Sequence, residues 1–509
     1  MIKNPPPKNL QEPPQILLIS GSDSSGAAGM QADMATCFGL GAHPQAAMTA
    51  VTAQYADAVI SVNPVSPQVL QDQLIASTHV GSPAAVKIGL IASAAQAGII
   101  KQQLHKQREW ENSMPVVWDP VMTSTSGASL TDDIQWMKSL LSVVDVVTPN
   151  VDEAERLTDC FIQQADDLKL VADLILQMGP QGVWIKGGHR QFDDHPDKQI
   201  DLFCWQGQCH WLVQDHLEIS NSRGTGCTLA TALAVFIAQL RLQNVGKPQD
   251  QILRDAVVLA SAYVHQGLKQ GYSLGIQAGP VARLSWPLEF NDYPAVVDNL
   301  SWLRLAPFPD CGNHPLGLYP VVDELIWLER LVKLGVPTLQ LRVKDKSEAE
   351  LDEIISAAVA LCQGSSSRLF INDYWQLAIK HGAYGVHLGQ EDMASADLHA
   401  IQAAGIRLGI STHGEFEWCR AASIQPSYLA IGAIYPTDTK DVVVVGEDNL
   451  YRWASILKQH FPLTAIGGIN LENLPTILGS GVASAAVVSA ITKADDYEQA
   501  TLSLLAAME

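Results

Sequence analysis

The sequence has few charged residues and an excess of acidic over basic side chains. Charged residues make up 17% of the chain, with 53 acidic against 32 basic side chains and a formal net charge of −21. This balance argues against a general nucleic-acid or anionic-membrane partner. It leaves room for phosphate ligands, because these need only local basic groups or a bound metal.

The sequence also lacks any regular cysteine spacing. Its eight cysteines form no C-x-x-C pair, which argues against a zinc site. Cys204 and Cys209 are the closest pair and flank a predicted hairpin turn. We expect reduced thiols rather than disulfides, as is usual in a cytoplasmic protein.

Long apolar segments are missing as well. The longest apolar runs, residues 229–240 and 482–491, are too short to span a bilayer. Residues 1–14 are polar and proline-rich without the apolar region of a signal peptide, so we expect an N-terminal tail. These features predict a soluble, cytoplasmic protein with no membrane partner.

A length of 509 residues and an apolar content of 47% predict two or three domains with substantial cores. In the first half, short apolar segments alternate with helical stretches, a pattern typical of an α/β domain with a largely parallel sheet. The predicted strands are residues 15–20, 85–91, 116–119, 143–148 and 182–186, and residues 202–213 are a predicted antiparallel hairpin.

A glycine-rich turn, Gly224-Thr225-Gly226-Cys227, precedes an apolar helical run. Free N–H groups and the dipole at a helix N-terminus favour an anion, so Gly224 and Gly226 are candidate phosphate-binding positions. Cys227 then lies where its sulfur can contact an anion or transfer a proton. The alternative is a glycine-rich turn into a core helix.

Polar residues follow several predicted strands of the first half. In open α/β sheets the ligand lies outside the carboxyl ends of the strands. A small-residue loop, residues 21–29, follows the first strand, and four further polar residues follow later ones, namely Asp119, Asn150, Glu153 and Lys186. Each is compatible with a helix cap or a surface group, but together they predict a site.

With these motifs in place, residues 15–285 resemble the hydroxymethylpyrimidine/phosphomethylpyrimidine kinases of the ribokinase-like superfamily. The resemblance implies phosphoryl transfer from ATP, and we expect the nucleotide to bind near Asp119, Asn150, Glu153, Gly224 and Gly226. A Mg²⁺ near Asn150 and Glu153 would help to stabilise the transferred charge. The resemblance also implies that Asp33 and Gln54 hold the aminopyrimidine, with Gly21 and Lys186 nearby, and that Cys227 lies at the anion hole. The matching segments are 21–33, 52–54, 87–89, 119–122, 148–155, 186–189 and 224–227.

Two positions depart from the family pattern. Thr125 replaces a usual lysine in the loop after Asp119, and Arg223 replaces a usual histidine before Gly224. Thr125 keeps open the alternative that the first half is a non-catalytic ligand-binding module. A kinase of B6-type alcohols is a second alternative, for which Asp33 and Gln54 are the residues to test.

Residues 275–311 lose periodicity and collect prolines, so we expect a linker at 286–311 between domains at 15–285 and 312–509. Because the linker contains Trp286 and Trp302, we expect it to lie on one of the domains. The second half contains eight short apolar segments separated by helical stretches, which predicts a (β/α)₈ barrel with its site at the carboxyl ends of the strands. The predicted strands are residues 316–322, 338–343, 368–371, 385–388, 407–410, 428–431, 463–466 and 485–488.

The strand ends of this barrel carry acids, bases and hydroxyl groups. Asp373 and Asp392 offer oxygen ligands suited to Mg²⁺. Arg342, Lys344 and Lys440 supply positive charge for a diphosphate. Small residues end the last two strands, as in the phosphate sites common to such barrels. The alternative is a solvated, charged rim.

The strand ends and following loops of residues 314–491 resemble those of thiamine phosphate synthase, a TIM barrel. The resemblance implies that hydroxymethylpyrimidine diphosphate binds through Gln340, Arg342, Lys344 and Asn372, with Mg²⁺ on Asp373 and Asp392. It implies that Ser411 and Lys440 lie near the diphosphate. The implied thiazole phosphate site comprises Thr437, Thr439, Gly468, Val488 and Ser489.

The whole sequence thus predicts a bifunctional enzyme of thiamine biosynthesis. Two ATP-dependent steps would convert hydroxymethylpyrimidine to its phosphate and diphosphate. The second half would then expel diphosphate, leaving a pyrimidine carbocation that the nitrogen of thiazole phosphate attacks. Because kinases of this type are often dimers, we expect a homodimer formed through the first domain.

Overall fold

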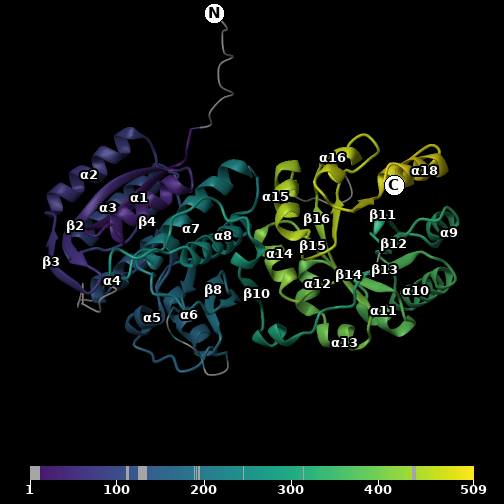
Figure 1. Ribbon diagram of the computed structural model, residues 1–509, viewed down its shortest axis with the longest axis horizontal. Helices are drawn as coiled ribbons and strands as arrows, with labels where there is room; N and C mark the ends of the chain where they lie inside the picture. Colours follow the sequence, from purple (N-terminus) through teal and green to yellow (C-terminus); the bar gives the residue numbers. More distant parts are fainter. Residues whose placement is uncertain are drawn as a thin grey trace, which may run out of the picture. The chain divides into compact units, whose positions relative to one another are not determined.

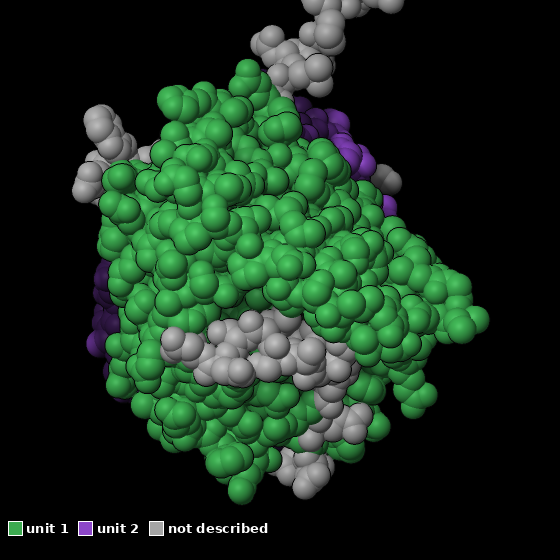
Figure 2. Space-filling model, turned by 90° about the vertical axis from the view of Figure 1, so that its left-hand side faces the viewer, with its two compact units in different colours: residues 1–287, 291–294 green, residues 288–290, 295–509 purple. Residues whose placement is uncertain are grey.

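The computed structural model describes residues 12–110, 114–123, 134–188, 190, 192, 195–244, 246–312, 314–437 and 443–508. The chain forms two compact units, coloured separately in Figure 2. The first unit comprises residues 1–287 and 291–294, and the second comprises residues 288–290 and 295–509.

The first unit is built on a mostly parallel sheet (Figure 1). Its strands follow the order β9-β8-β7-β6-β5-β4-β1-β2-β3, and the run from β7 to β2 is parallel. This confirms the predicted α/β class. The strands are β1 (Gln15–Asp23), β2 (His43–Tyr55), β3 (Ala58–Pro64), β4 (Ala85–Ile88), β5 (Val116–Trp118), β6 (Val146–Val147), β7 (Gly182–Ile185), β8 (Lys198–Trp205) and β9 (Gln208–Asp215).

Buried residues dominate the central strands of this sheet. Ile16 to Ile19 of β1 are each at most 1% exposed, as expected for a strand covered on both faces. The helices of the unit are α1 (Gly29–Gly39), α2 (Pro67–Val80), α3 (Ala94–Trp110), α4 (Ile134–Leu140), α5 (Val151–Thr158), α6 (Asp167–Gln177), α7 (Thr225–Gln243) and α8 (Gln249–Lys269).

Three local expectations for the first unit are wrong. Residues 141–143 form a short 3₁₀ helix, so β6 begins only at Val146. A disulfide joins Cys204 and Cys209, which lie directly opposite each other on β8 and β9. Helix α7 has 19 residues and is long and apolar enough to cross a membrane, although 67% of its apolar window is buried inside the fold, as in a core helix.

The second unit contains a closed parallel barrel, which confirms the predicted eight-stranded TIM barrel (Figure 1). Each strand pairs with the next, and β18 closes on β11. The strands are β11 (Gly317–Val322), β12 (Thr338–Leu341), β13 (Arg368–Asn372), β14 (Gly385–Leu388), β15 (Arg407–Thr412), β16 (Tyr428–Gly432), β17 (Leu463–Ile466) and β18 (Ser484–Val487).

The helices of the second unit lie between and after these strands. A capping box starts α10, where Ser347 and Glu350 satisfy each other's backbone N–H groups. The helices are α9 (Leu325–Lys333), α10 (Glu348–Gln363), α11 (Trp375–His381), α12 (Gln390–Ser395), α13 (Leu398–Ala403), α14 (Glu415–Ala422), α15 (Glu447–Leu457), α16 (Leu474–Gly479), α17 (Ser489–Thr492) and α18 (Tyr497–Ala506).

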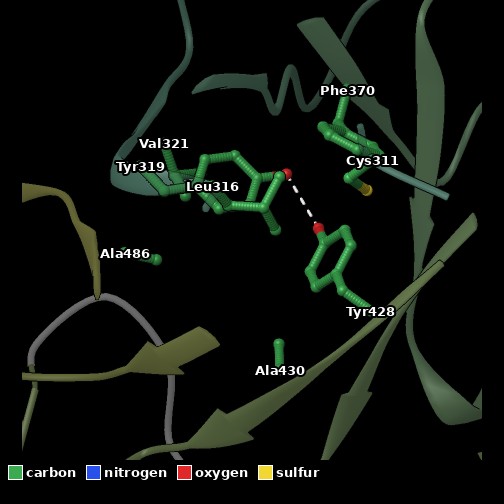
Figure 3. Close-up of a cluster of buried hydrophobic side chains, with 8 residues drawn as sticks. All are labelled: Cys311, Leu316, Tyr319, Val321, Phe370, Tyr428, Ala430 and Ala486. Carbon is green, nitrogen blue, oxygen red and sulfur yellow. Dashed lines mark hydrogen bonds between the residues drawn. The ribbon is translucent and has the colours of Figure 1, made fainter. Parts of the chain in front are cut away.

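Aromatic rings fill the interior of the barrel. Tyr319, Phe370 and Tyr428 are buried there with small and aliphatic neighbours. Figure 3 shows the hydroxyl groups of Tyr319 and Tyr428 facing each other, and their oxygens are 2.8 Å apart. Burial raises the pKa of both tyrosines above the ordinary range, so both hydroxyls stay protonated.

The segment between α8 and the barrel is divided between the units. Asp292 belongs to the first unit, where its carboxylate accepts a 2.8 Å hydrogen bond from Lys269. Phe290 belongs to the second unit and stacks on His460 at 4.3 Å between ring centroids. Strand β10 (Ala295–Val297) also belongs to the second unit. Much of the expected linker is therefore packed structure.

Candidate functional sites

The loop after β1 is held by Asp23, whose role no sequence motif indicated. Its carboxylate accepts 2.8 Å hydrogen bonds from the N–H groups of Ser25 and Ala28, and it also binds the Ser25 hydroxyl. Arg223 lies 3.7 Å from Asp23 and is 5% exposed. The arginine that departs from the family pattern thus connects this loop to the start of α7.

The start of α7 requires glycine at position 224 and is tightly packed at position 226. Gly224 has φ +76°, and a Cβ atom there would lie 2.2 Å from the carbonyl oxygen of Ala27. Arg283 donates a 2.7 Å hydrogen bond to the same carbonyl. A Cβ atom on Gly226 would lie 3.2 Å from an oxygen of Asp119. The first loop and the end of β5 therefore pack closely against the α7 turn.

Asp119 and Lys186 form an ion pair of 2.8 Å beside this turn. Burial acts to lower the pKa of Lys186, but the carboxylates of Asp119 and Glu153 raise it above its ordinary value. The ammonium therefore stays charged. The ends of β5 and β7 thus lie close to the N-terminus of α7, which brings a cation near the backbone N–H groups of the turn.

Asn150 and Glu153 cap α5. The Asn150 side chain accepts from the N–H of Glu153, and the Glu153 carboxylate accepts from the N–H of Asn150, each at 2.8 Å. Burial raises the pKa of Glu153 to about 7, although Lys186 opposes this shift. The predicted contribution of this pair to Mg²⁺ or ATP binding stays a prediction.

Cys227 lies in the first turn of α7. Burial raises the pKa of its thiol to about 11, against the opposing charge of Lys87. At neutral pH the sulfur is therefore a protonated thiol, which suits contact with an anion better than action as a base.

Asp33, the predicted pyrimidine ligand, is 0% exposed. Both of its oxygens bind Lys87, at 2.7 and 2.8 Å, and Thr231 donates a further hydrogen bond at 2.9 Å. The backbone N–H of Gln54 donates to the Ser24 hydroxyl at 2.9 Å, which joins the end of β2 to the first loop. The predicted pyrimidine contacts of Asp33, Gln54 and Gly21 stay predictions, and Thr125 lies outside the described residues.

In the barrel, the carboxyl ends of β12 and β13 present the residues predicted for the pyrimidine diphosphate. Gln340 and Asn372 are buried, 5% and 7% exposed, whereas Lys344 is exposed. Gln340 also donates to the Tyr319 hydroxyl at 3.2 Å. Arg342 follows β12 directly and attracts the carboxylate of Asp373.

Asp373 and Asp392 face each other at the same end of the barrel. Burial and the neighbouring Asp392 carboxyl together raise the pKa of Asp373 to about 6, while Arg342 opposes the shift. No cluster of three or more metal-ligating side chains occurs among the described residues. Mg²⁺ commonly takes one or two carboxylates together with substrate phosphates, so this pair fits the ion that both sequence resemblances imply.

The predicted thiazole phosphate site lies in the loops after β16, β17 and β18. Gly468 has φ +65°, and a Cβ atom there would lie 2.7 Å from the Pro436 carbonyl oxygen, so only glycine is free of strain. Val488 and Ser489 begin α17, and Thr437 ends the described part of its loop. Thr439 and Lys440 lie outside the described residues.

Two family models match the chain. The phosphomethylpyrimidine kinase model matches residues 23–282, and the thiamine monophosphate synthase model matches residues 318–491. The chain belongs to both families. Its first unit is a ribokinase-like kinase unit and its second a synthase unit. It is a transferase of thiamine biosynthesis with phosphomethylpyrimidine kinase and thiamine-phosphate synthase activities.

Relatives of the synthase unit are similar over nearly their whole length. The thiamine-phosphate synthase of Yersinia pestis is 54% identical over 207 residues, which cover 40% of this chain and 94% of the relative. That of Photorhabdus laumondii is 54% identical over 206 residues, with 40% and 94% covered.

Solved structures similar to the kinase unit include two kinases. A pyridoxal kinase from Staphylococcus aureus, in complex with AMP-PCP and pyridoxal, is 31% identical with a TM-score of 0.45 and covers 54% of this chain and 94% of its own. A phosphomethylpyrimidine kinase from Clostridium difficile is 31% identical with a TM-score of 0.39, covering 48% and 96%.

Proposed function

We propose that the kinase unit phosphorylates hydroxymethylpyrimidine and then its phosphate, and that the synthase unit joins the resulting diphosphate to thiazole phosphate. The observation that carries the kinase half is the convergence of Asp119, Lys186 and the Gly224–Cys227 turn. The facing carboxyls of Asp373 and Asp392 carry the synthase half.

In the kinase unit, phosphoryl transfer needs positioning and charge stabilisation. The N–H groups of Gly224 to Cys227 would donate to the oxygens of the transferred phosphoryl group. Lys186, kept charged by Asp119, would balance the negative charge that these oxygens carry. Asp33, Gln54 and Gly21 would hold the pyrimidine, and Asp119, Asn150 and Glu153 would face the nucleotide.

In the synthase unit, Gln340 and Asn372 would orient the aminopyrimidine diphosphate. Arg342, Lys344 and Lys440 would bind the departing diphosphate, and Ser411 would lie beside it. The aminopyrimidine would carry the positive charge left when diphosphate departs. The nitrogen of thiazole phosphate would then attack, so no protein nucleophile is needed.

Thiazole phosphate would be held through its phosphate by the small-residue loops of the barrel. These residues are Thr437, Thr439, Gly468, Val488 and Ser489. Mg²⁺, when bound beside Glu153 in the kinase unit and on Asp373 and Asp392 in the synthase unit, supplies positive charge that neutralises phosphate oxygens. The enzyme would act in the cytoplasm on these small molecules, as a homodimer formed through the kinase unit.

A one-pot assay tests both halves. Hydroxymethylpyrimidine, thiazole phosphate, ATP and Mg²⁺ are incubated with the full chain, and thiamine phosphate is measured. We expect product from the wild type, accumulation of the pyrimidine diphosphate in Asp373→Ala, and a loss of diphosphate formation in Cys227→Ala. Product formed only from ready-made pyrimidine diphosphate would refute the kinase half.

A further inference from the structure

The segment that follows the kinase unit is anchored on a helix of the synthase barrel. The N–H of Val296 in β10 donates to the hydroxyl of Ser423, at the end of α14, at 2.8 Å. Two residues later, the Asp298 carboxylate accepts hydrogen bonds from the guanidinium of Arg420, one from Nε at 3.2 Å and one from Nη2. Arg420 also lies against the ring of Trp302, with 5.6 Å to the ring centroid.

Arg420 also contacts Gln390, which lies at the mouth of the barrel. Its Nη1 donates to the backbone oxygen of Gln390 at 3.0 Å and to the side-chain Oε1 of Gln390 at 2.9 Å. Arg420 is only 5% exposed. Because a guanidinium has donors and no acceptor, it fixes which end of the Gln390 amide faces it.

The other end of that amide holds a predicted substrate-binding residue. Gln390 Nε2 donates to the backbone oxygen of Ser411 at 2.8 Å. The Ser411 hydroxyl lies 2.8 Å from Nε2 of His387, whose Nδ1 lies 2.7 Å from the Tyr428 hydroxyl. Ser411 is therefore fixed through its backbone from the Arg420 side and through its side chain from the barrel interior.

We propose that Asp298 and Arg420 are positioning residues for the synthase reaction, so that the segment joining the two units orients Ser411 through Gln390. Asp298 holds the buried guanidinium in place, the guanidinium orients the amide, and the amide sets the end of β15. This inference rests on the proposed function, which places Ser411 beside the diphosphate of the pyrimidine substrate.

The test uses the full chain and ready-made hydroxymethylpyrimidine diphosphate as the variable substrate. We expect Asp298→Asn and Arg420→Met to raise its KM roughly tenfold, in the range of outer-shell substitutions that disturb a ligand's orientation. The KM for thiazole phosphate and the kinase activity of the same chains stay as in the wild type. Glu289→Gln, which neutralises an exposed acid of the same segment, is the matched control and leaves both KM values unchanged.

Two further variants separate positioning from general support. Arg420→Lys keeps the charge but lacks the planar fork, so it should restore only part of the affinity. The double variant Asp298→Asn/Arg420→Met should be no worse than Arg420→Met, because both act through one chain of contacts. Lowered thermal stability with an unchanged KM for the pyrimidine diphosphate in both single variants would overturn the inference. A wild type without synthase activity would instead overturn the proposed function.

Discussion

The buried pair of Asp33 and Lys87 provides the sharpest test of the kinase unit. Both side chains are 0% exposed, and the ammonium lies 2.7 and 2.8 Å from the two carboxylate oxygens. Burial acts to lower the pKa of Lys87, but Asp33 outweighs it and raises that pKa above the ordinary range. Replacing Lys87 with Met leaves the Asp33 carboxylate in the core without its cation, although Thr231 still donates a hydrogen bond to it.

Removing one partner of a buried ion pair costs about 3–5 kcal/mol, because the remaining charge is desolvated without compensation. At about 1.4 kcal/mol per factor of ten, this is roughly two to four orders of magnitude in the unfolding equilibrium constant. The double variant Asp33→Asn/Lys87→Met removes both charges and keeps a partner for Thr231. We expect it to recover most of the loss.

Hydrogen–deuterium exchange with mass spectrometry measures the loss of stability separately in each unit. This matters because a chain with two units need not unfold in one step. In Lys87→Met, peptides from α1, β1 and β4 should lose protection by this amount. Peptides from the barrel strands serve as the internal reference and should exchange as in the wild type.

The pH dependence of Lys87→Met has a defined sign. Burial already raises the pKa of Asp33, and removing Lys87 takes away the main opposing influence. A carboxyl whose pKa is higher in the folded than in the unfolded state stabilises the fold when protonated, and this stability is lost as the pH rises. The loss in free energy of unfolding of Lys87→Met, relative to the wild type, should therefore be largest at neutral pH and become smaller at acidic pH. An equal deficit at every pH, or a double variant less stable than both single variants, would refute the reasoning.

Three further predictions concern the synthase unit and the cysteines. Asp373→Asn should lower the synthase kcat/KM by roughly a hundredfold and leave kinase activity unchanged, because one of two Mg²⁺ carboxylates is lost. Tyr428→Phe removes the hydroxyl that lies between Tyr319 and His387, and should destabilise the barrel by about 1–3 kcal/mol in denaturant unfolding. Thiol titration of denatured, unreduced protein should count the six free cysteines and not all eight.

Each of these predictions has a clear counter-result. Tyr497→Phe, which removes an exposed hydrogen bond to the adjacent Glu498, is the control for Tyr428→Phe and should be nearly neutral. Equal stability of the two variants would show that the buried hydrogen bonds of Tyr428 do not stabilise the barrel. Synthase activity retained by Asp373→Asn would contradict the metal assignment, and a count of eight thiols would contradict the disulfide.

The sequence predicted the barrel well because its strands are short, buried and separated by helices at regular intervals. Strand β14 is found at the predicted residues, Gly385–Leu388, and so is β17, Leu463–Ile466. The prediction of a strand over residues 143–148 failed at its start, because the apolar run that ends at Val143 continues a helix as a 3₁₀ turn and β6 begins only at Val146. Apolar composition alone does not distinguish a buried helical turn from a short strand.

The residue types at the candidate sites were predictable from the sequence, but the contacts between them were not. The strand ends pointed to Asp119 and Lys186, and the structure joins them in an ion pair. The pair of Asp33 and Lys87 spans 54 positions, and Asp298 and Arg420 are separated by 122. Such contacts depend on how distant elements pack, which no local pattern encodes.

The division of residues 288–294 between the units has a practical consequence for anyone who wishes to study the halves separately. Asp292 serves the kinase unit through Lys269 and His265, whereas Phe290 serves the synthase unit by stacking on His460. A single cut in this stretch therefore takes a packed side chain from one half or the other. Intact halves require overlapping fragments, with the first extending through Pro294 and the second starting at Leu288.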